Sequence, residues 1–296
     1  MTNNVLNVGA FLDGYRDSLP IIIRCKEEAD WYRYWQSEGM NHLDPALMAL
    51  KGGIHAPNLA YVFISGYQAA MRYVFPETPE DGWTAFAASE DSHNPDKNPP
   101  LMATTTAETI TLTGTKSWVA QSKSVDYLIV TAKSNNDDRV MTLVKTDQKG
   151  LVISHRESPS FLADMSQGFA RFSAVSISTN ACIPGDRLKT FMKSESKFIM
   201  LALSGWLYSQ SLINQLALSN DFKSLATDYF SACCDNVVKV TTLATLDTRM
   251  QLLFNQFDNE SDTGPIANWQ GDRALVSTYS KGIQYSAAKK VALTVS

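Results

Sequence analysis

The cysteines and histidines, two residue types that often carry chemistry, occur singly in this sequence apart from one adjacent pair of thiols. Cys233 and Cys234 could act as a redox pair, but neighbouring cysteines on a predicted helix are usually small buried side chains, and we favour that interpretation. Cys25 and Cys182 form no C-x-x-C spacing. The histidines are scattered singly, which predicts packing or surface roles and no metal site: His42, His55, His93 and His155.

Generic catalytic motifs are also absent from the sequence. The patterns G-x-G-x-x-G, G-x-x-x-x-G-K, G-x-S-x-G and H-E-x-x-H do not occur, so the usual signals of nucleotide-loop enzymes, elbow-type hydrolases and zinc peptidases are missing. The chain has 26 Lys and Arg against 30 Asp and Glu. Because a phosphate backbone is bound by a surplus of basic residues, we do not expect a nucleic-acid partner.

Secretion and membrane insertion have no clear signal either. Met1 is followed by polar residues and not by the charged and apolar regions of a signal peptide. Residues 198–220 form a 23-residue stretch without charge, but many of them are Ser, Asn or Gln. Such a segment is too polar for a lone helix in hydrocarbon, and it predicts a helix inside a protein bundle. We therefore expect a cytoplasmic, thiol-reduced protein without a membrane span.

Helical patterns dominate residues 1–83. Ser18-Leu-Pro20 resembles a helix start, and apolar residues at three- and four-residue steps then predict one amphipathic helix that ends at Gly39. Asn58 opens a second predicted helix, which Pro76 ends.

The pattern changes to short strands in residues 84–186. Runs rich in Val, Ile, Thr and aromatic residues are separated by polar turn sequences, and they lie at residues 109–112, 125–133, 139–146, 151–155 and 169–177. Strands at such spacing, with no helical pattern between them, predict an antiparallel sandwich or barrel.

Helical periodicity returns in residues 187–296. Apolar residues from Leu225 to Phe257 would line one face of a single long helix, and a polar break at residues 258–265 precedes a last helix from about Ile266. The sequence thus predicts an α+β protein with an N-terminal helical domain (1–83), a central β-domain (84–186) and a C-terminal helical bundle (187–296).

Three segments of the β-domain carry a family resemblance. Residues 85–91 read A-F-A-A-S-E-D, residues 114–120 read G-T-K-S-W-V-A, and residues 125–131 read V-D-Y-L-I-V-T. Together they resemble the T-E-P-x-x-G-S-D loop, the G-x-K-x-W-I-T/S strand and the A-D-x-x-x-V strand of the acyl-CoA dehydrogenase family. That family has the same order of helices, sheet and helices.

The resemblance implies an FAD cofactor on the sheet. A flavin ring needs hydrogen-bond donors along its pyrimidine edge and at N5, because negative charge develops there when hydride arrives. In the family's pattern the first segment contributes Phe86, Ala88 and Ser89, which line the flavin ring. The second segment contributes Trp118, which packs on the ring, and the amide of Ala120, which lies near N5.

Several departures from the family pattern weaken the expected grip on FAD and substrate. Pro95 replaces the serine of G-S-D, and Ala120 replaces the Ser or Thr near N5. Of the R-x-x-F-G motif only Phe222 matches, with Ser219 and Lys223 in place of Arg and Gly. No Q-x-x-G-G or Y-E-G-T segment occurs. The resemblance therefore implies a shortened bundle that lacks one helix, and weak retention of FAD.

The family's reaction needs a carboxylate that removes the α-proton of an acyl thioester. Some members carry this glutamate on the first helix after the sheet, where Ser194-Glu195-Ser-Lys197 stands here. Glu195 is the candidate base. The alternative is a first-turn glutamate that the helix dipole favours, and the helix start and Lys197 would then both lower its pKa.

Two functions remain open at this point. One is an acyl-CoA dehydrogenase-like flavoprotein oxidoreductase of fatty acid metabolism, which acts on the CH–CH group of an acyl thioester such as an acyl-CoA. The other is a divergent member that has lost FAD binding or catalysis and serves as a binding or partner subunit. In either case the apolar C-terminal helices predict a homo-oligomer or a mixed oligomer with a related subunit.

Overall fold

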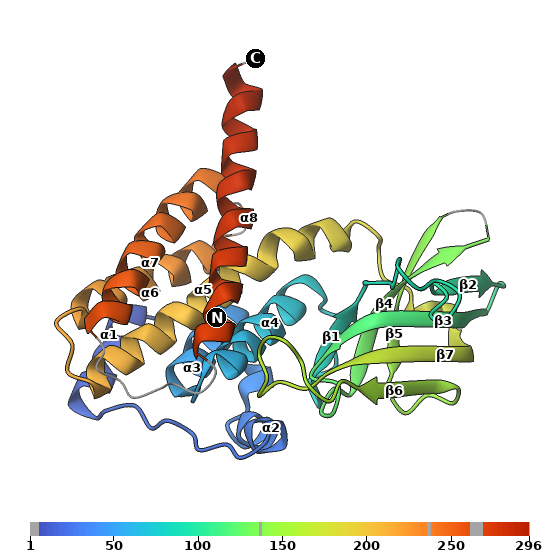
Figure 1. The fold of residues 1–296 in the computed structure, drawn as a ribbon, viewed down its shortest axis with the longest axis horizontal. Helices are drawn as coiled ribbons and strands as arrows, with labels where there is room; N and C mark the ends of the chain where they lie inside the picture. The colour runs from blue at the N-terminus through green and yellow to red at the C-terminus, as the bar shows by residue number, and fades with distance from the viewer. Residues whose placement is uncertain (1–5, 136–137, 236–237, 261–268, 296) are drawn as a thin grey trace, which may run out of the picture. The chain divides into compact units, whose positions relative to one another are not determined.

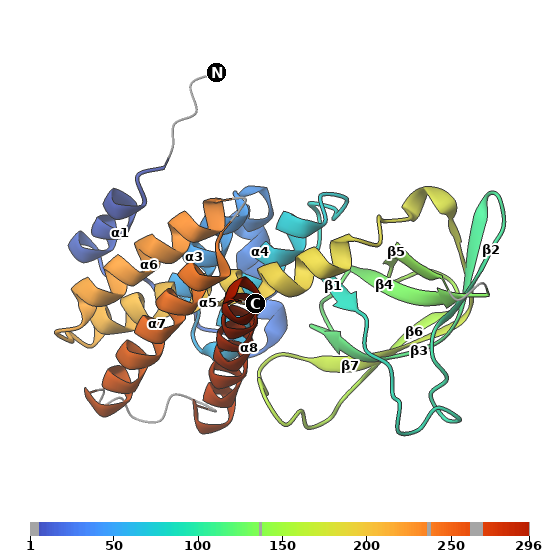
Figure 2. The ribbon, with the colours of Figure 1, turned by 90° about the horizontal axis from the view of Figure 1, so that it is seen from above.

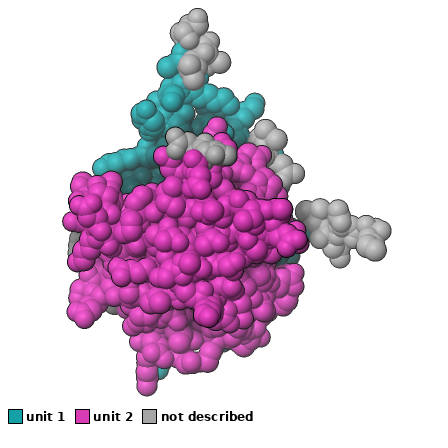
Figure 3. All heavy atoms as spheres, turned by 90° about the vertical axis from the view of Figure 1, so that its right-hand side faces the viewer, with its two compact units in different colours: residues 1–24, 43–70, 193–296 teal, residues 25–42, 71–192 magenta. Residues whose placement is uncertain are grey.

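The computed structural model describes residues 6–135, 138–235, 238–260 and 269–295. They form two compact units (Figure 3). The helical unit comprises residues 1–24, 43–70 and 193–296, and the sheet unit comprises residues 25–42 and 71–192. The strand block predicted at 84–186 therefore lies in one unit with a preceding helix, and we describe each unit by itself.

The sheet unit is built on one curled seven-stranded sheet (Figures 1 and 2). The strand order is β1-β4-β2-β3-β7-β6, and β5 pairs with β4 at its side. The strands are β1 Thr84–Ala87, β2 Met102–Thr105, β3 Thr109–Ala120, β4 Tyr127–Ser134, β5 Arg139–Lys145, β6 Leu151–His155 and β7 Gln167–Ser178. All five predicted strand runs are confirmed, and β1 and β2 are additional.

The sheet is mixed, which corrects the prediction of a wholly antiparallel one. β1 and β2 each pair with β4 in parallel, whereas the remaining pairs are antiparallel. Parallel pairing needs a long crossover between the two strands, and the loop, β2 and β3 between β1 and β4 supply it. β4 accordingly reads as a nearly continuous apolar run, with Leu128, Ile129 and Val130 fully buried.

The helix predicted from Ser18 to Gly39 forms only in its second half, and a helix that was not predicted lies before it. α1 (Val8–Asp17) ends at Ser18, whose hydroxyl donates to the carbonyl of Gly14, so Ser18 closes one helix and does not open the next. α2 (Glu28–Ser37) begins ten residues later. Its start is fixed by a capping box in which the Asp30 carboxylate accepts the backbone N–H of Glu27.

Buried polar contacts attach α2 to the sheet within the sheet unit. The carboxylate of Asp126, which belongs to the third motif, accepts the hydroxyl of Tyr32 at 2.6 Å and the backbone N–H of Trp83 at 2.9 Å. The buried Glu28 carboxylate accepts the N–H of Ser166 at 2.6 Å. Burial raises the pKa of Glu28, and these hydrogen bonds oppose that effect. α2 is thereby fixed beside the start of β1.

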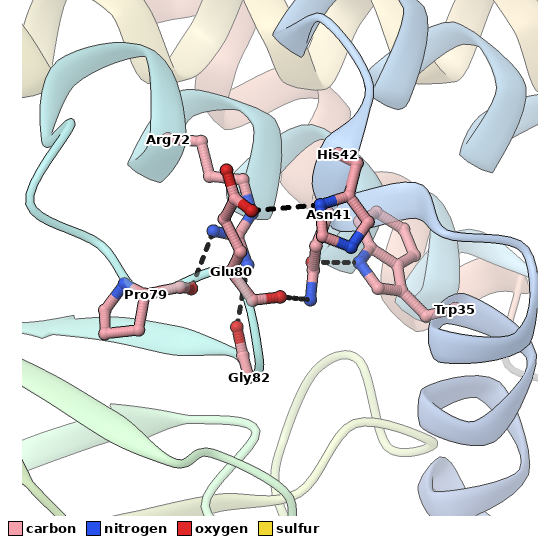
Figure 4. Close-up of polar contacts among 7 residues, drawn as sticks. All are labelled: Trp35, Asn41, His42, Arg72, Pro79, Glu80 and Gly82. Carbon is pink, nitrogen blue, oxygen red and sulfur yellow. Dashed lines mark hydrogen bonds and ion pairs between the residues drawn. The ribbon is translucent and has the colours of Figure 1, made fainter.

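The loop that leads into β1 is held by a second set of contacts (Figure 4). Arg72, near the end of α4 (Leu59–Val74), donates to the carbonyls of Pro79 at 2.9 Å and Gly82 at 2.7 Å. Asn41 donates to the carbonyl of Glu80 at 2.8 Å. Three backbone acceptors are thus satisfied by side chains, which fixes where β1 begins.

The helical unit contains α1, the first part of α4 and α5 (Arg187–Ile213) from residue 193 onward. It also contains α3 Pro45–His55, α6 Ser219–Cys234, α7 Val240–Glu260 and α8 Trp269–Val295. The start of α4 is as predicted, because the Asn58 side chain accepts the N–H of Ala60 at 3.1 Å. The predicted polar break at 258–265 falls largely on residues 261–268, which lie outside the described residues.

The single long helix predicted across Leu225–Phe257 is wrong. α6 ends at Cys234 and α7 begins at Val240, and the two helices contact each other through Phe222 and Phe257 and through the Arg249–Asp228 ion pair at 2.7 Å. The apolar pattern continues across the turn because each helix buries that face against its neighbours. Four helices follow the sheet in the described residues, so the expected loss of one bundle helix is also wrong.

Two glycines let the helices of this unit approach closely. A Cβ on Gly66 of α4 would lie 2.5 Å from the Cα of Ile199, and one on Gly53 of α3 would lie 2.0 Å from the carbonyl oxygen of Ala202. Both obstacles are backbone atoms of α5, which cannot turn aside as a side chain can. The uncharged stretch is therefore the centre of a tightly packed bundle. None of the described helices is long and apolar enough to span a bilayer.

Candidate functional site

The loop after β1 lies against the middle of β3. The carbonyl of Ser89 accepts the backbone N–H of Ser117 at 2.9 Å. The Lys116 ammonium donates to the Glu90 carboxylate at 2.7 Å and to the carbonyl of Ala88 at 3.1 Å. The structure therefore brings the first two motifs together, as the flavin-site prediction requires.

Lys116 and Glu90 form an unequal ion pair. The Lys116 side chain is 1% exposed, whereas that of Glu90 is 37% exposed. Burial lowers the pKa of Lys116, and the Glu90 carboxylate opposes that shift. Because a buried ammonium needs acceptors, this pair fixes the 88–90 loop on β3. Both residues stood in the quoted motifs, but the sequence pattern alone did not single them out as a contact.

Trp118 is presented by an irregularity in β3. The pairing of β3 with β7 shifts register between Lys116 and Val119, and bulges of this kind re-aim a side chain. The half-buried Trp118 indole N–H donates to Gln167 at 3.3 Å. Gln167 is 2% exposed and donates in turn to the carbonyl of Phe161 at 2.6 Å. Gln167, which sequence reasoning missed, thus orients the ring that would pack on a flavin.

The side chain of Phe86 lies deeper in the sheet unit than the flavin prediction expects, and the side chain of Ala120, for which the prediction concerns only the backbone amide, is buried as well. The Phe86 ring packs between Phe75 and Phe191, with centroid separations of 5.7 and 5.0 Å. Ala120 is fully buried and pairs in register with Gln167. Their side chains belong to the core, so any contact of these two residues with a cofactor would come from the backbone.

The edge formed by residues 88–90 and 117–118 offers donors of the kind that a flavin ring needs. Within the described part of the chain, the backbone N–H groups of Ser89 and Glu90 have no hydrogen-bond acceptor. They stand beside Trp118, which is linked to the same edge through the Ser89–Ser117 hydrogen bond. Rigid backbone donors next to an aromatic ring are what the pyrimidine edge of a flavin requires.

Glu195 lies in the helical unit, well inside α5. The helix begins at Arg187, more than two turns before Glu195, so the prediction of a first-turn glutamate is wrong. The predicted effect of Lys197 is wrong too, because its buried ammonium donates to the carbonyl of Cys233 at 3.4 Å and plays no part in the pKa of Glu195. Burial raises that pKa from 4.5 to about 7, although a hydrogen bond from Tyr279 opposes the shift.

An apolar pocket adjoins Glu195 through Tyr279. The Tyr279 hydroxyl on α8 donates to the Glu195 carboxylate at 3.1 Å. Tyr279 also lines a small pocket whose walls come from α4, α5 and α8, among them Leu59, Phe63, Ile199, Leu203 and Val276. A carboxyl group with a pKa near neutrality beside an apolar pocket is suited to proton transfer at carbon. No sequence pattern pointed to Tyr279, because the register of α8 against α5 is a tertiary property.

The remaining candidates from the sequence have structural environments. Cys233 is buried, burial raises the pKa of its thiol strongly, and its sulfur donates to the carbonyl of Lys197 at 3.5 Å. A thiol of this kind is a poor nucleophile, which agrees with the packing interpretation. Among the described residues, no group of three or more His, Cys, Asp and Glu side chains is arranged to hold a metal ion.

Comparison with known proteins finds no matching family model and no matching curated protein. Solved structures do match over nearly the entire chain. Butyryl-CoA dehydrogenase from Megasphaera elsdenii has 12% identity and a TM-score of 0.64, covering 98% of this chain and 100% of that one. The prolyl acyl carrier protein oxidase AnaB has 13% identity and a TM-score of 0.66, covering 96% and 97%.

A third similar structure is a complex of PigA with FAD, at 14% identity and a TM-score of 0.63, covering 99% of this chain and 100% of that one. Identities this low concern the fold. The order of elements agrees with them: N-terminal helices, a curled central sheet and a C-terminal helical bundle. The chain is therefore a divergent example of the acyl-CoA dehydrogenase fold.

Proposed function

We propose that this protein is an FAD-dependent oxidoreductase that removes hydrogen from the CH–CH group of an acyl thioester, with Glu195 as the base. The observation that carries the proposal is the half-buried Glu195 carboxyl, with a pKa of about 7, beside Tyr279 and an apolar pocket. A glutamate in water is almost fully charged and a weak base, whereas this one gains proton affinity from burial.

The proposed reaction removes one proton and one hydride from the thioester. The Glu195 carboxylate takes the α-proton of the thioester, and the electron pair of that C–H bond forms the Cα=Cβ double bond as the β-hydrogen leaves with its own pair. FAD, when bound, supplies the acceptor for that hydride. The pocket that Tyr279 lines is mostly apolar, and burial of Glu195 keeps its carboxylate desolvated.

The edge of the sheet unit would hold the flavin ring. In this proposal the N–H groups of Ser89 and Glu90 donate to the ring, Ala88 borders it, and Trp118 packs on it. Phe86 and Ala120 contribute through the backbone. The Glu90–Lys116 pair and Gln167 keep this edge rigid, which spares the donors reorganisation during hydride transfer.

A second candidate function is a binding or partner subunit without FAD or catalysis, and one observation favours it. The positions of the family's R-x-x-F-G motif are used differently here: Ser219 begins α6, and Lys223 forms an ion pair with Asp13 at 2.5 Å inside the helical unit. Neither residue provides the Arg of the motif. Acyl-CoA as ligand, fatty acid metabolism, a homo-oligomer or mixed oligomer and a cytoplasmic location remain predictions.

The test combines cofactor binding with substrate bleaching. Protein purified with added FAD is mixed anaerobically with acyl-CoAs and with acyl carrier protein thioesters, prolyl thioester included, and flavin absorbance is followed. We expect wild type to bleach and Glu195→Gln to bleach at least a hundredfold more slowly. Glu260→Gln, an exposed glutamate at the end of α7, is the matched control and should behave as wild type.

Each alternative has its own outcome in this experiment. Equal bleaching by wild type and Glu195→Gln would remove Glu195 as base. Bound FAD that no thioester bleaches would exclude the catalytic proposal. Failure to bind FAD at high micromolar concentration would favour the partner-subunit function.

A further inference from the structure

The hydroxyl of Tyr279 is directed at the Glu195 carboxylate from a different helix. Glu195 belongs to α5 and Tyr279 to α8, 84 residues further along the chain, and the oxygen atoms are 3.1 Å apart. Both side chains are half-buried in the helical unit. A hydrogen bond between neutral donor and charged acceptor in such a setting is stronger than one in water.

The surroundings make this hydrogen bond the main polar contact of the carboxylate. The pocket walls nearby are mostly apolar, and Lys197 on the same helix faces the carbonyl of Cys233 instead. The other titratable groups close to the pair are Tyr67 of α4, which acts on Tyr279, and Asp272 of α8, which lines the pocket. None of these neighbours supplies a positive charge to Glu195.

We propose that Tyr279 is the positioning residue for Glu195: it holds the carboxylate in one orientation at the pocket and stabilises the charged form that a base needs. The proposal rests on the proposed function of Glu195. Tyr279 itself stays protonated, because burial and the nearby Glu195 charge raise its pKa well above 10. It therefore donates in both protonation states of Glu195.

The proposal predicts a shift in the pH profile and not a uniform loss. Without the donor, burial acts on Glu195 unopposed, so in Tyr279→Phe the pKa of Glu195 rises by about one unit above its value of about 7. In the pH profile of the bleaching rate, the acidic limb should move to higher pH by the same amount. At about pH 6.5 the variant should be several-fold slower than wild type, and at about pH 9 the difference should shrink to the smaller loss caused by the freed orientation of the carboxylate.

A readout independent of the flavin separates this proposal from the proposed function. Protein labelled with ¹³C at glutamate side-chain carboxyls is titrated without FAD, and the signal missing in Glu195→Gln assigns residue 195. We expect a midpoint near 7 in wild type and near 8 in Tyr279→Phe. Tyr285→Phe is the matched control, since Tyr285 lies on the same helix and is 71% exposed.

Outcomes of the titration decide the proposal even where no thioester is oxidised. An unchanged or lower midpoint in Tyr279→Phe would overturn it, and so would an equal rate loss at every pH. If Tyr279→Phe does not fold, the ultraviolet difference spectrum of wild type is recorded as a function of pH instead. We expect the tyrosine absorbance to change with a midpoint near 7 in wild type and not in Glu195→Gln. If the absorbance of wild type shows no such change, the proposal is overturned.

Discussion

The Glu90–Lys116 pair offers the sharpest test of how the flavin edge is held, because its two members can be removed separately. Glu90→Gln keeps the size of the side chain and removes the charge. Lys116→Met removes the ammonium and keeps an unbranched apolar chain in the buried space. Both residues lie in the sheet unit, so the comparison does not involve the helical unit.

The expected free energies of unfolding are unequal for a physical reason. In Glu90→Gln the Lys116 ammonium stays 1% exposed, with the carbonyl of Ala88 at 3.1 Å and the hydroxyl of Thr131 at 3.4 Å as its remaining partners. Removing one partner of a buried pair costs about 3–5 kcal/mol. Because Glu90 is 37% exposed and Gln still accepts a hydrogen bond, we expect about 2 kcal/mol.

Lys116→Met leaves a different residue behind. Glu90 is exposed enough to be hydrated on its own, so no charge is stranded, and we expect a loss of less than about 1 kcal/mol. Urea unfolding followed by tryptophan fluorescence measures both variants. A loss for Lys116→Met equal to or larger than that for Glu90→Gln would refute this reasoning.

The pH dependence of Glu90→Gln gives an internal check. Burial lowers the pKa of Lys116 below 10.5, and loss of the Glu90 charge lowers it further. The native state then binds fewer protons than the unfolded state, so stability rises with pH through the window between the lowered pKa and 10.5. Part of the loss measured at about pH 7 should therefore be recovered at about pH 9.5.

Three further predictions concern the helical unit. Gly66→Ala should lower the free energy of unfolding, measured by heat or urea, by about 3 kcal/mol, because its Cβ would lie 2.5 Å from the Ile199 backbone. Gly14→Ala has open space around the new Cβ and should raise the free energy of unfolding by about 0.5 kcal/mol. As pH rises from 4.5 to about 7, wild type should lose about 3 kcal/mol of its free energy of unfolding relative to Glu195→Gln, because a carboxyl with a raised pKa favours the native state only while it is protonated. A constant difference between the two proteins across this range would contradict the pKa of about 7. Light scattering should show a dimer or larger, since α7 and α8 expose Leu252 (63%) and Tyr285 (71%), and a monomeric mass at every concentration would exclude self-association.

Five of the seven strands could be predicted from the sequence because their signals are local. Alternation and turn residues located β6 at its observed bounds and the other predicted strands within a few residues, apart from β3. Thr109–Leu112 was recognised as a strand, but β3 continues to Ala120 through Gly114 and a register shift, which interrupt the alternation. Parallel pairing of β1 with β4 is a long-range choice that no local pattern encodes.

Helix ends were predicted less well, and for a definable reason. Apolar periodicity shows which face is buried, but it is the same on both sides of a turn between antiparallel helices, so α6 and α7 read as one. Ser18 fits the end of one helix as well as the start of another. Tertiary packing decides where α6 ends and α7 begins, and the capping box at Glu27 and Asp30 decides where α2 begins.

The position of Glu195 bears on whether it serves the fold or a reaction. A glutamate retained for helix stability belongs in the first turn, where the helix dipole and solvent favour its charge. Glu195 lies further inside α5, in surroundings that raise its pKa to about 7, so its charged form lowers the stability of the protein at neutral pH. Leucine or methionine would fill the same apolar surroundings without that loss. The proposed function gives a reason for a half-buried carboxyl that reduces stability, is paired with a tyrosine and lies beside a pocket, because a base for proton transfer needs such surroundings.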